Sequence, residues 1–245
     1  MIDWVPADWP APASIRAGTT GRSGGLSQKG WSSLNLATHV GDDSQAVAGN
    51  RRLLREALAL PAEPCWLEQV HGTTVLDLDA DMPEFPVEAD AAFTRQSGVV
   101  CAVLTADCLP LLMTDAGGTT VAAVHAGWRG LQAGIVQRAV SEMRVPSRDL
   151  LVWLGPAIGQ QAFEVGEEVR ETFVQSDPEC ESAFLQQDQG KWLADLYALA
   201  RILLRGMGVQ QIYGGDHCSY AEPQRFYSYR RERQCGRMAS LIWRC

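Results

Sequence analysis

Short runs of apolar residues occupy the middle of the chain. They begin after Pro64, and each is roughly 4 to 7 residues long, a length typical of strands rather than helices. We therefore predict strands at 65–70, 73–78, 91–94, 99–105, 109–114 and 120–125. The tetrapeptide Asp115-Ala-Gly-Gly118 separates the last two runs and is typical of a hairpin turn.

Longer stretches on either side of these runs have helical spacing. A helix is predicted from Asp43 or Ser44 to Leu60, with Ser44 as its cap and Pro61 as its stop signal. Further helices are predicted at 131–143, 165–174 and 193–206, and further strands at 150–154 and 210–213. The chain before Ala17 reads as extended, and the glycine-rich segment 18–27 reads as a loop.

The order of these elements indicates the fold class. Strands gather in the middle of the chain and helices flank them, which favours an α+β fold over a regularly alternating parallel sheet. We expect a layered α/β sandwich with mixed sheets. Because the chain shows neither an internal repeat nor a low-complexity linker, residues 1–245 are expected to form one domain.

Charge and composition narrow the class of protein. The chain has 21 Lys plus Arg against 29 Asp plus Glu, and a net charge of −8 disfavours non-specific binding to nucleic acid. The N-terminus lacks the features of a secretory signal, and no stretch approaches the roughly 18 apolar residues of a membrane span. We expect a cytoplasmic protein that binds neither nucleic acid nor membranes. The seven cysteines are odd in number and form no CxxC pair, which argues against a disulfide framework and a zinc ribbon.

Three residues are candidates for a reactive centre. His71 in QVHG and His125 in VHAG end predicted strands, where side chains often face ligands. Cys108 lies between two apolar runs. One thiolate and two imidazoles suit zinc and leave the fourth tetrahedral position open for water. Taken singly, each residue has an ordinary structural alternative, as a hydrogen-bonding histidine or a buried thiol, and their spacing matches no compact zinc motif.

Other segments allow both a functional and a structural reading. Residues 155–159 are a binding loop or a Gly-Pro turn, with the turn favoured, and residues 226–231 line a pocket or form a solvated strand. Arg22 holds an anion or lies on the surface, whereas His39 and His217 are expected to be structural. The glycines at 21–25 do not have the order of a P-loop.

Five motifs, taken in order, resemble one family. The strings QVHG, TADCLPLL, HAGWRGL, GPAIG with FEVG, and FYSYRR with GR are similar in order and wording to the YfiH/laccase-domain family. The resemblance extends from Arg22 to Arg237, and TADC together with HAGWRG is highly specific. Members of that family have been called polyphenol oxidases, peptidoglycan editing factors and purine nucleoside phosphorylases.

The resemblance implies one zinc ion per chain, bound by His71, Cys108 and His125. It also implies phosphorolysis of adenosine, guanosine, inosine and methylthioadenosine, with inorganic phosphate as co-substrate, and deamination of adenosine to inosine. The implied fold is related to that of cysteine-hydrolase-like toxins. The chain departs from the family pattern at 161–163 and at 218–219, outside the metal residues, which bears on substrate preference.

This resemblance suggests roles for the remaining polar and aromatic residues. Asp107 is expected to join the three metal residues as a catalytic group that moves a proton, and Trp128 or Phe226 is expected to stack on the purine. An arginine is expected to neutralise phosphate. The expected substrate-binding residues are Arg22, Asn35, Gln69, Arg129 and Arg230. We expect a monomer whose partner is a small nucleoside.

Three alternatives remain open. In the first, the protein is a hydrolase that removes a wrongly incorporated amino acid from a UDP-muramyl precursor of peptidoglycan, with Cys108 as the nucleophile and His125 as its base. A copper polyphenol oxidase is disfavoured, because multicopper sites need more than the four histidines present. A non-catalytic binding protein is disfavoured by an open three-ligand site.

Overall fold

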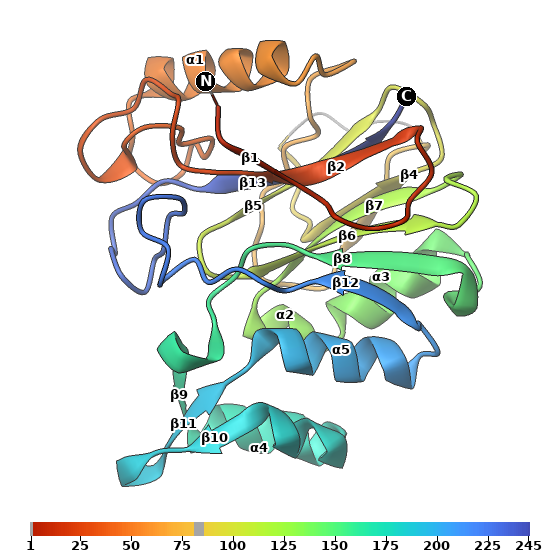
Figure 1. The fold of residues 1–245 in the computed structure, drawn as a ribbon, viewed down its shortest axis with the longest axis vertical. Helices are drawn as coiled ribbons and strands as arrows, with labels where there is room; N and C mark the ends of the chain where they lie inside the picture. The colour runs from red at the N-terminus through yellow and green to blue at the C-terminus, as the bar shows by residue number, and fades with distance from the viewer. Residues whose placement is uncertain (1, 81–85) are drawn as a thin grey trace.

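Two sheets form the centre of the molecule (Figure 1). The computed structural model describes residues 2–80 and 86–245. The four-stranded sheet has the order β1 (Trp4–Pro6), β2 (Ile15–Thr20), β13 (Met238–Arg244), β5 (Val100–Thr105). The six-stranded sheet has the order β12 (Gln211–Gly214), β8 (Leu150–Leu154), β6 (Leu109–Asp115), β7 (Val121–Ala126), β4 (Ala91–Thr94), β3 (Val75–Asp77). Its two outer pairs are parallel and its inner pairs are antiparallel, so the sheet is mixed.

Helices cover the outer faces of both sheets. In Figure 1, α1 (Ser44–Ala57) lies over the four-stranded sheet, and α2 (Trp128–Ala133), α3 (Ile135–Met143) and α5 (Leu196–Gly206) lie under the six-stranded sheet. A small sheet of β10 (Phe184–Gln186), β11 (Lys191–Ala194) and β9 (Glu164–Gly166) lies beside α4 (Glu167–Ser176). The short 3₁₀ helices are Lys29–Trp31, Ser147–Asp149, Gln160–Ala162, Pro178–Ala183 and Asp188–Gly190.

The layered arrangement explains why the central strands are apolar throughout. In β7, Val121 and Ala123 belong to the core between the sheets, whereas Ala122 and Val124 belong to the core under the helices. Since successive side chains of a strand point to opposite faces, a strand buried on both faces reads as a continuous apolar run. The predicted α+β class with layered mixed sheets is confirmed.

Several predicted elements agree with the structure, and others need correction. The strands at 91–94 and 150–154 and the hairpin turn after Asp115 are as predicted. The first helix starts at Ser44, but its cap is Asp43, whose side chain accepts hydrogen bonds from the main-chain N–H groups of Gln45 and Ala46. It ends at Ala57 rather than Leu60.

The other corrections concern the ends and continuity of elements. The helix predicted at 131–143 is divided by Gly134, whose φ of +96° favours glycine. Val165 and Leu193 lie in strands, and the predicted loop at 18–27 begins inside β2. Residues 65–70 make only single bridges, at Cys65 and Glu68. Residues 226–231 contain no strand, and 229–231 form a turn. Strand β13 was not predicted, although its residues are almost wholly apolar.

Hydropathy and helix length bear on membrane insertion. Over 2–80 and 86–245, every helix is too short or too polar to cross a bilayer.

Candidate metal centre

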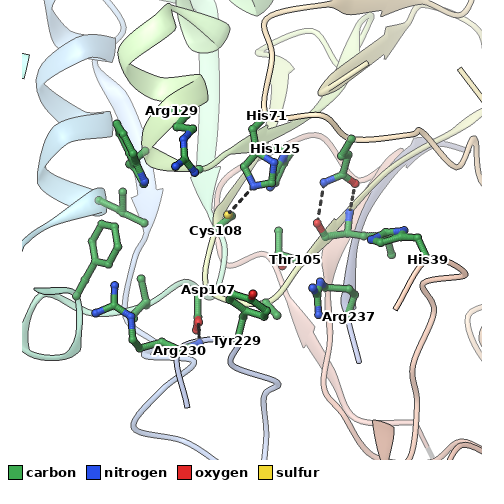
Figure 2. A pocket seen from close by; sticks show the side chains of 18 residues that line it. His39, His71, Thr105, Asp107, Cys108, His125, Arg129, Tyr229, Arg230 and Arg237 are labelled. Carbon is green, nitrogen blue, oxygen red and sulfur yellow. Dashed lines mark hydrogen bonds between the residues drawn. The ribbon is translucent and has the colours of Figure 1, made fainter. Parts of the chain in front are cut away.

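Three segments bring His71, Cys108 and His125 together. Cys108 lies in the turn between β5 and β6, and His125 lies near the end of β7, opposite Pro110 of β6. The possible ligand atoms of the three residues all lie within 4.8 Å of one another. Figure 2 shows the Cys108 thiol facing the two imidazole rings, and its Sγ lies 3.8 Å from His71 Nε2. We call these three residues the His–Cys–His group.

His71 reaches the group from a turn and not from a strand end as predicted. Its φ is +61°, a conformation that few residues other than glycine adopt. Asp107, the residue before Cys108, also has a positive φ, at +88°. Non-glycine residues held in this region cost free energy and concentrate at functional sites. One of these two conformations therefore lies at a residue of the group, and the other lies directly before one.

A buried carboxylate stands behind the group. Asp90 has no exposed surface, and its Oδ1 accepts a hydrogen bond of 2.8 Å from His125 Nδ1. This bond leaves His125 Nε2 free to bind a ligand. The sequence reasoning did not identify Asp90. Its signal in the sequence is weak, since it is a single acid directly before an apolar strand.

The donor set suits a metal ion such as zinc, and the sulfur–nitrogen separation can be compared with that of a zinc site. With Zn–N distances of about 2.0 Å and a Zn–S distance of about 2.3 Å, tetrahedral coordination separates a nitrogen from a sulfur by about 3.5 Å. The separation of 3.8 Å between Cys108 Sγ and His71 Nε2 is close to that value. Gly127 faces the same space, where a Cβ would lie 2.9 Å from Cys108 Sγ and 3.2 Å from His71 Cδ2. The glycine thus leaves room for the thiol and the imidazole to converge.

Charges within the group alter the pKa values of its members. Burial would raise the pKa of the Cys108 thiol, but the charge of His125 and hydrogen bonds from both histidines lower it to about 6. Burial would lower the pKa of His125, but the Cys108 thiolate and the Asp90 carboxylate raise it to about 9. Without a metal, the two opposite shifts favour a thiolate on Cys108 and an imidazolium on His125.

The group lines a cavity of about 440 Å³. This volume lies in the range of small-molecule sites, which is roughly 300 to 1,000 Å³. Figure 2 shows side chains from several segments around it. The lining includes the predicted residues Gln69, Asp107, Arg129 and Arg230, and Tyr229 from the candidate pocket segment 226–231. It also includes His39, Thr105, Phe163 and Arg237, which were not predicted as site residues.

Asp107 is held by two hydrogen bonds. Its Oδ1 accepts from the Ser219 hydroxyl at 2.7 Å, and its Oδ2 accepts from the main-chain N–H of Arg230 at 2.6 Å. The carboxylate therefore joins the Cys108 turn to two other segments. This placement favours a structural role over the predicted transfer of a proton.

The arginines of the cavity differ in how many partners they have. The Arg230 guanidinium donates to the carbonyl oxygens of Glu164 and Ala162. Arg129 is exposed and lies over the Trp128 ring, 4.6 Å from its centroid. Among the described residues, its guanidinium has no ion pair or hydrogen bond partner. Arg129 is therefore the cation best placed to bind an anion.

Three predicted substrate contacts are engaged elsewhere. Arg22 lies outside the lining of this cavity and donates to the carbonyl oxygens of Ser32 and Pro223. Asn35 is fully buried and accepts a hydrogen bond from the main-chain N–H of Arg237. Gln69 lines the cavity, but its side-chain amide pairs with both main-chain groups of Leu104. Only Gln69 of the three lines the cavity, and its side-chain amide is already occupied by the main chain of Leu104.

The aromatic residues also differ from the prediction. Phe226 is completely buried, so it has no face on which a base could stack. Trp128, Phe163 and Tyr229 line the cavity, and Tyr229 has 44% of its surface exposed. His39, expected to be structural, lines the cavity as well. His217 interacts instead with Glu222.

The fold and the site together define a layered α+β protein with an open His–Cys–His group in a cavity. The chain belongs to the family described as multi-copper polyphenol oxidoreductase laccase, whose model matches residues 16–245. The resemblance seen in the motifs is thereby confirmed.

Curated relatives match over nearly the whole chain. A protein of Pseudomonas aeruginosa, named as a purine nucleoside phosphorylase, is 52% identical over 99% of both chains. The purine nucleoside phosphorylase YfiH of Escherichia coli is 50% identical, again over 99% of both chains. Because these relatives match over nearly the full length and are named as enzymes, the chain is an enzyme.

Solved structures show the same fold. A protein of Neisseria meningitidis is 47% identical and has a TM-score of 0.95, with 99% of each chain covered. YlmD of Geobacillus stearothermophilus is 32% identical and has a TM-score of 0.92, with 99% of this chain and 96% of that chain covered.

Proposed function

We propose that this protein is a zinc-dependent purine nucleoside phosphorylase that acts in the cavity around the His–Cys–His group. The observation that carries the proposal is the convergence of two imidazoles and a thiol in an open cavity. Relatives that are half identical over the full chain and named for this activity support it. One group of this type exists among the described residues, and the chain has four histidines, which is too few for a multicopper oxidase.

His71, Cys108 and His125 would hold one zinc ion, which supplies a Lewis acid at the cavity wall when bound. The donor set is open because it provides three ligands. Asp90 holds the His125 ring so that its Nε2 faces the group.

Arg129 would bind the phosphate that attacks C1′ of the ribose. The reaction forms a C1′–O bond and breaks the C1′–N9 bond, whose electron pair leaves with the purine and is then protonated. A planar guanidinium binds phosphate through two parallel hydrogen bonds and neutralises its charge during the attack. Arg129 is exposed and lines the cavity, and the N–H groups of its guanidinium donate no hydrogen bond to any of the described residues. Trp128 or Tyr229 would stack on the purine.

Thr105 offers a further contact for the nucleoside. Its hydroxyl is buried, with 1% of the residue exposed, and Oγ1 has no hydrogen bond partner among the described residues. The residue lines the cavity, so a bound ligand would satisfy this hydroxyl. Buried hydroxyl groups without partners are rare because each costs free energy.

Thr105→Val is therefore expected to raise the KM for the nucleoside about 10-fold and to leave the melting temperature unchanged or higher. Valine has a similar shape and replaces only the hydroxyl, which bonds to no described residue, with a methyl group. Steady-state kinetics and thermal unfolding measure the two effects. Thr105→Ser is the control and should keep the KM, and an unchanged KM in Thr105→Val would exclude the contact.

The activity has a direct test. Purified zinc-loaded protein with adenosine and phosphate should yield adenine and ribose 1-phosphate, and both products are separable by chromatography. The proposal extends to guanosine, inosine and methylthioadenosine, and to hydrolysis of adenosine to inosine and ammonia. Absence of a phosphate-dependent product with every one of these nucleosides would overturn it.

The proposal includes the wider expectations for the protein. We place it in the cytoplasm as a single-domain monomer of residues 1–245 whose partner is a small nucleoside and not a nucleic acid. The net charge of −8 supports the last point.

A second candidate function is a cysteine hydrolase, and the pairing of Cys108 with His125 favours it. Their shifted pKa values give a thiolate beside an imidazolium, which is the arrangement of a cysteine nucleophile and its acid. The substrate would be an amide, as in removal of an amino acid from a muramyl precursor. A second cavity of about 730 Å³ shares His39, Gln69 and Leu104 with the first and offers room for such a larger substrate.

Alkylation distinguishes the two functions. In metal-free protein, Cys108 is expected to react with iodoacetamide at a nearly constant rate from pH 9 down to about 7, and to lose reactivity as the pH falls through about 6. The thiolate is the reactive form, and its pKa is lowered, so it persists above pH 6. Peptide mass spectrometry reports the modified residue. The buried thiols of Cys65, Cys101, Cys180 and Cys235 have raised pKa values and should stay unmodified.

Zinc should protect Cys108 if the residue is a ligand. Protein purified with one zinc ion per chain should resist alkylation until a chelator is added. Protein purified without metal, with a reactive Cys108 and amidase activity, would favour the hydrolase instead.

A further inference from the structure

Asp90 lies directly before β4 and accepts four hydrogen bonds in its side chain. Its Oδ1 accepts from His125 Nδ1 at 2.8 Å and from the main-chain N–H of His71 at 3.0 Å. Its Oδ2 accepts from the main-chain N–H of Gly72 at 2.6 Å and of Val70 at 3.3 Å. One carboxylate thus contacts the segments that carry both histidines of the His–Cys–His group.

The first contact determines the state of the His125 ring. A carboxylate only accepts hydrogen bonds, so the bond to Nδ1 requires a proton on that nitrogen. Nε2 then faces the group with its lone pair when the ring is neutral. The main chain is fixed as well, because the N–H of His125 donates to the carbonyl oxygen of Asp90 at 2.7 Å.

The other contacts hold the turn that carries His71. Its φ of +61° costs about 1 kcal/mol or more for a residue with a side chain. Three successive N–H groups, of Val70, His71 and Gly72, point at the same carboxylate. These charge-assisted bonds compensate the strain and keep the imidazole directed at Cys108.

We propose that Asp90 is a positioning residue that sets both imidazoles of the metal centre at once. This inference rests on the proposed metal-binding function and assigns its geometry to one buried side chain. The donors that converge on Asp90 come from both sides of it in the sequence, 18 to 20 residues before it and 35 residues after it.

An asparagine cannot replace this carboxylate in either orientation. If its amide oxygen stays at the Oδ1 position, its NH₂ group opposes the N–H groups of Gly72 and Val70, and the His71 turn loosens. If the amide is flipped, its NH₂ group meets His125 Nδ1 and moves the ring proton to Nε2, which can then bind no metal. Each orientation therefore removes one histidine from the group.

Asp90→Asn is accordingly expected to weaken zinc binding about 10- to 100-fold. Competition with a chromophoric chelator on metal-free protein measures the affinity without reference to activity. Thermal unfolding of the same metal-free samples measures stability. A residue that only supported the fold would lower the melting temperature and leave the zinc affinity of the folded protein unchanged.

Asp115 provides a matched control. It is also buried, at 7% exposed, and its carboxylate also accepts four hydrogen bonds, from Gly117, Thr120 and two donors of Thr119. It lies at the opposite end of β6, about 20 Å from the Cys108 turn by strand length. Asp115→Asn should lower stability but keep zinc affinity within about twofold of the wild type.

The outcomes separate this inference from the proposed function. Wild-type protein that binds no zinc would overturn the metal function and this inference with it. Wild-type affinity in Asp90→Asn would overturn the inference alone. If Asp90→Asn does not fold, Asp90→Ser, in which water can reach the N–H groups, takes its place with the same expected loss. Failure of both to fold while Asp115→Asn folds would assign Asp90 to general stability and overturn the inference.

Discussion

Cys108→Ala is expected to yield a folded protein that no longer retains zinc and whose phosphorolysis falls by about 10³-fold or more. Cys108 provides the only sulfur of the His–Cys–His group, and two imidazoles alone form an incomplete site. Metal content after gel filtration and the rate of adenine release measure the two losses. His71→Ala and His125→Ala should behave alike, because each removes one of the three donors.

Cys218→Ala is the control for the loss of a thiol. Cys218 is half-buried like Cys108, and its Sγ accepts hydrogen bonds from the main-chain N–H groups of Gly159 and Ala221. It lies outside the His–Cys–His group, so its removal should leave zinc content and the rate close to those of the wild type. Full activity in Cys108→Ala would exclude both the metal mechanism and a cysteine nucleophile.

Gly127→Ala is expected to weaken zinc binding about 100-fold while the protein remains folded. The added methyl group would lie 2.9 Å from Cys108 Sγ and 3.2 Å from His71 Cδ2, so one of the two must move. The φ of Gly127 is −67°, which any residue adopts, so alanine causes no backbone strain here. The expected loss of zinc affinity therefore comes from the contact of the methyl group with the two side chains. Chelator competition and the melting temperature of the metal-free protein separate affinity from stability.

Gly206→Ala is the matched control for added bulk at a glycine. A Cβ at Gly206 would meet no atom within 4 Å among the described residues, and the residue ends α5 away from the group. This variant should keep zinc affinity and gain slightly in stability. Tight zinc binding in Gly127→Ala would contradict the close approach of Cys108 and His71 at this glycine.

Much of the fold could be predicted because local pattern and burial coincide. The strands at 91–94 and 150–154 are buried on both faces, and their apolar runs are bounded by polar or turn residues. Breaks caused by backbone conformation were harder to predict. Periodicity continues across Gly134, so the division into α2 and α3 depends on a φ of +96°.

Contacts between residues far apart in the sequence explain why some predicted site residues do not face the cavity and why Asp90 was not predicted. Arg22 and Asn35 look like free polar residues in the sequence, but carbonyl and N–H groups far along the chain engage them. Phe226 reads as an exposed aromatic in a basic segment, yet it is completely buried. The role of Asp90 depends on donors up to 35 residues away, which no local motif records.

The amino-acid sequence by itself determined the secondary-structure class, the family and the three residues of the group. Its apolar runs reflect burial residue by residue, and the motifs QVHG, TADC and HAGWRG identify His71, Cys108 and His125. Only the tertiary structure decided which polar groups remain free in the cavity and which carboxylate sets the two histidines. Hydrogen bonds between residues far apart in the sequence occupy many polar side chains. The donors that remain free can therefore be identified only when the positions of all possible partners are known.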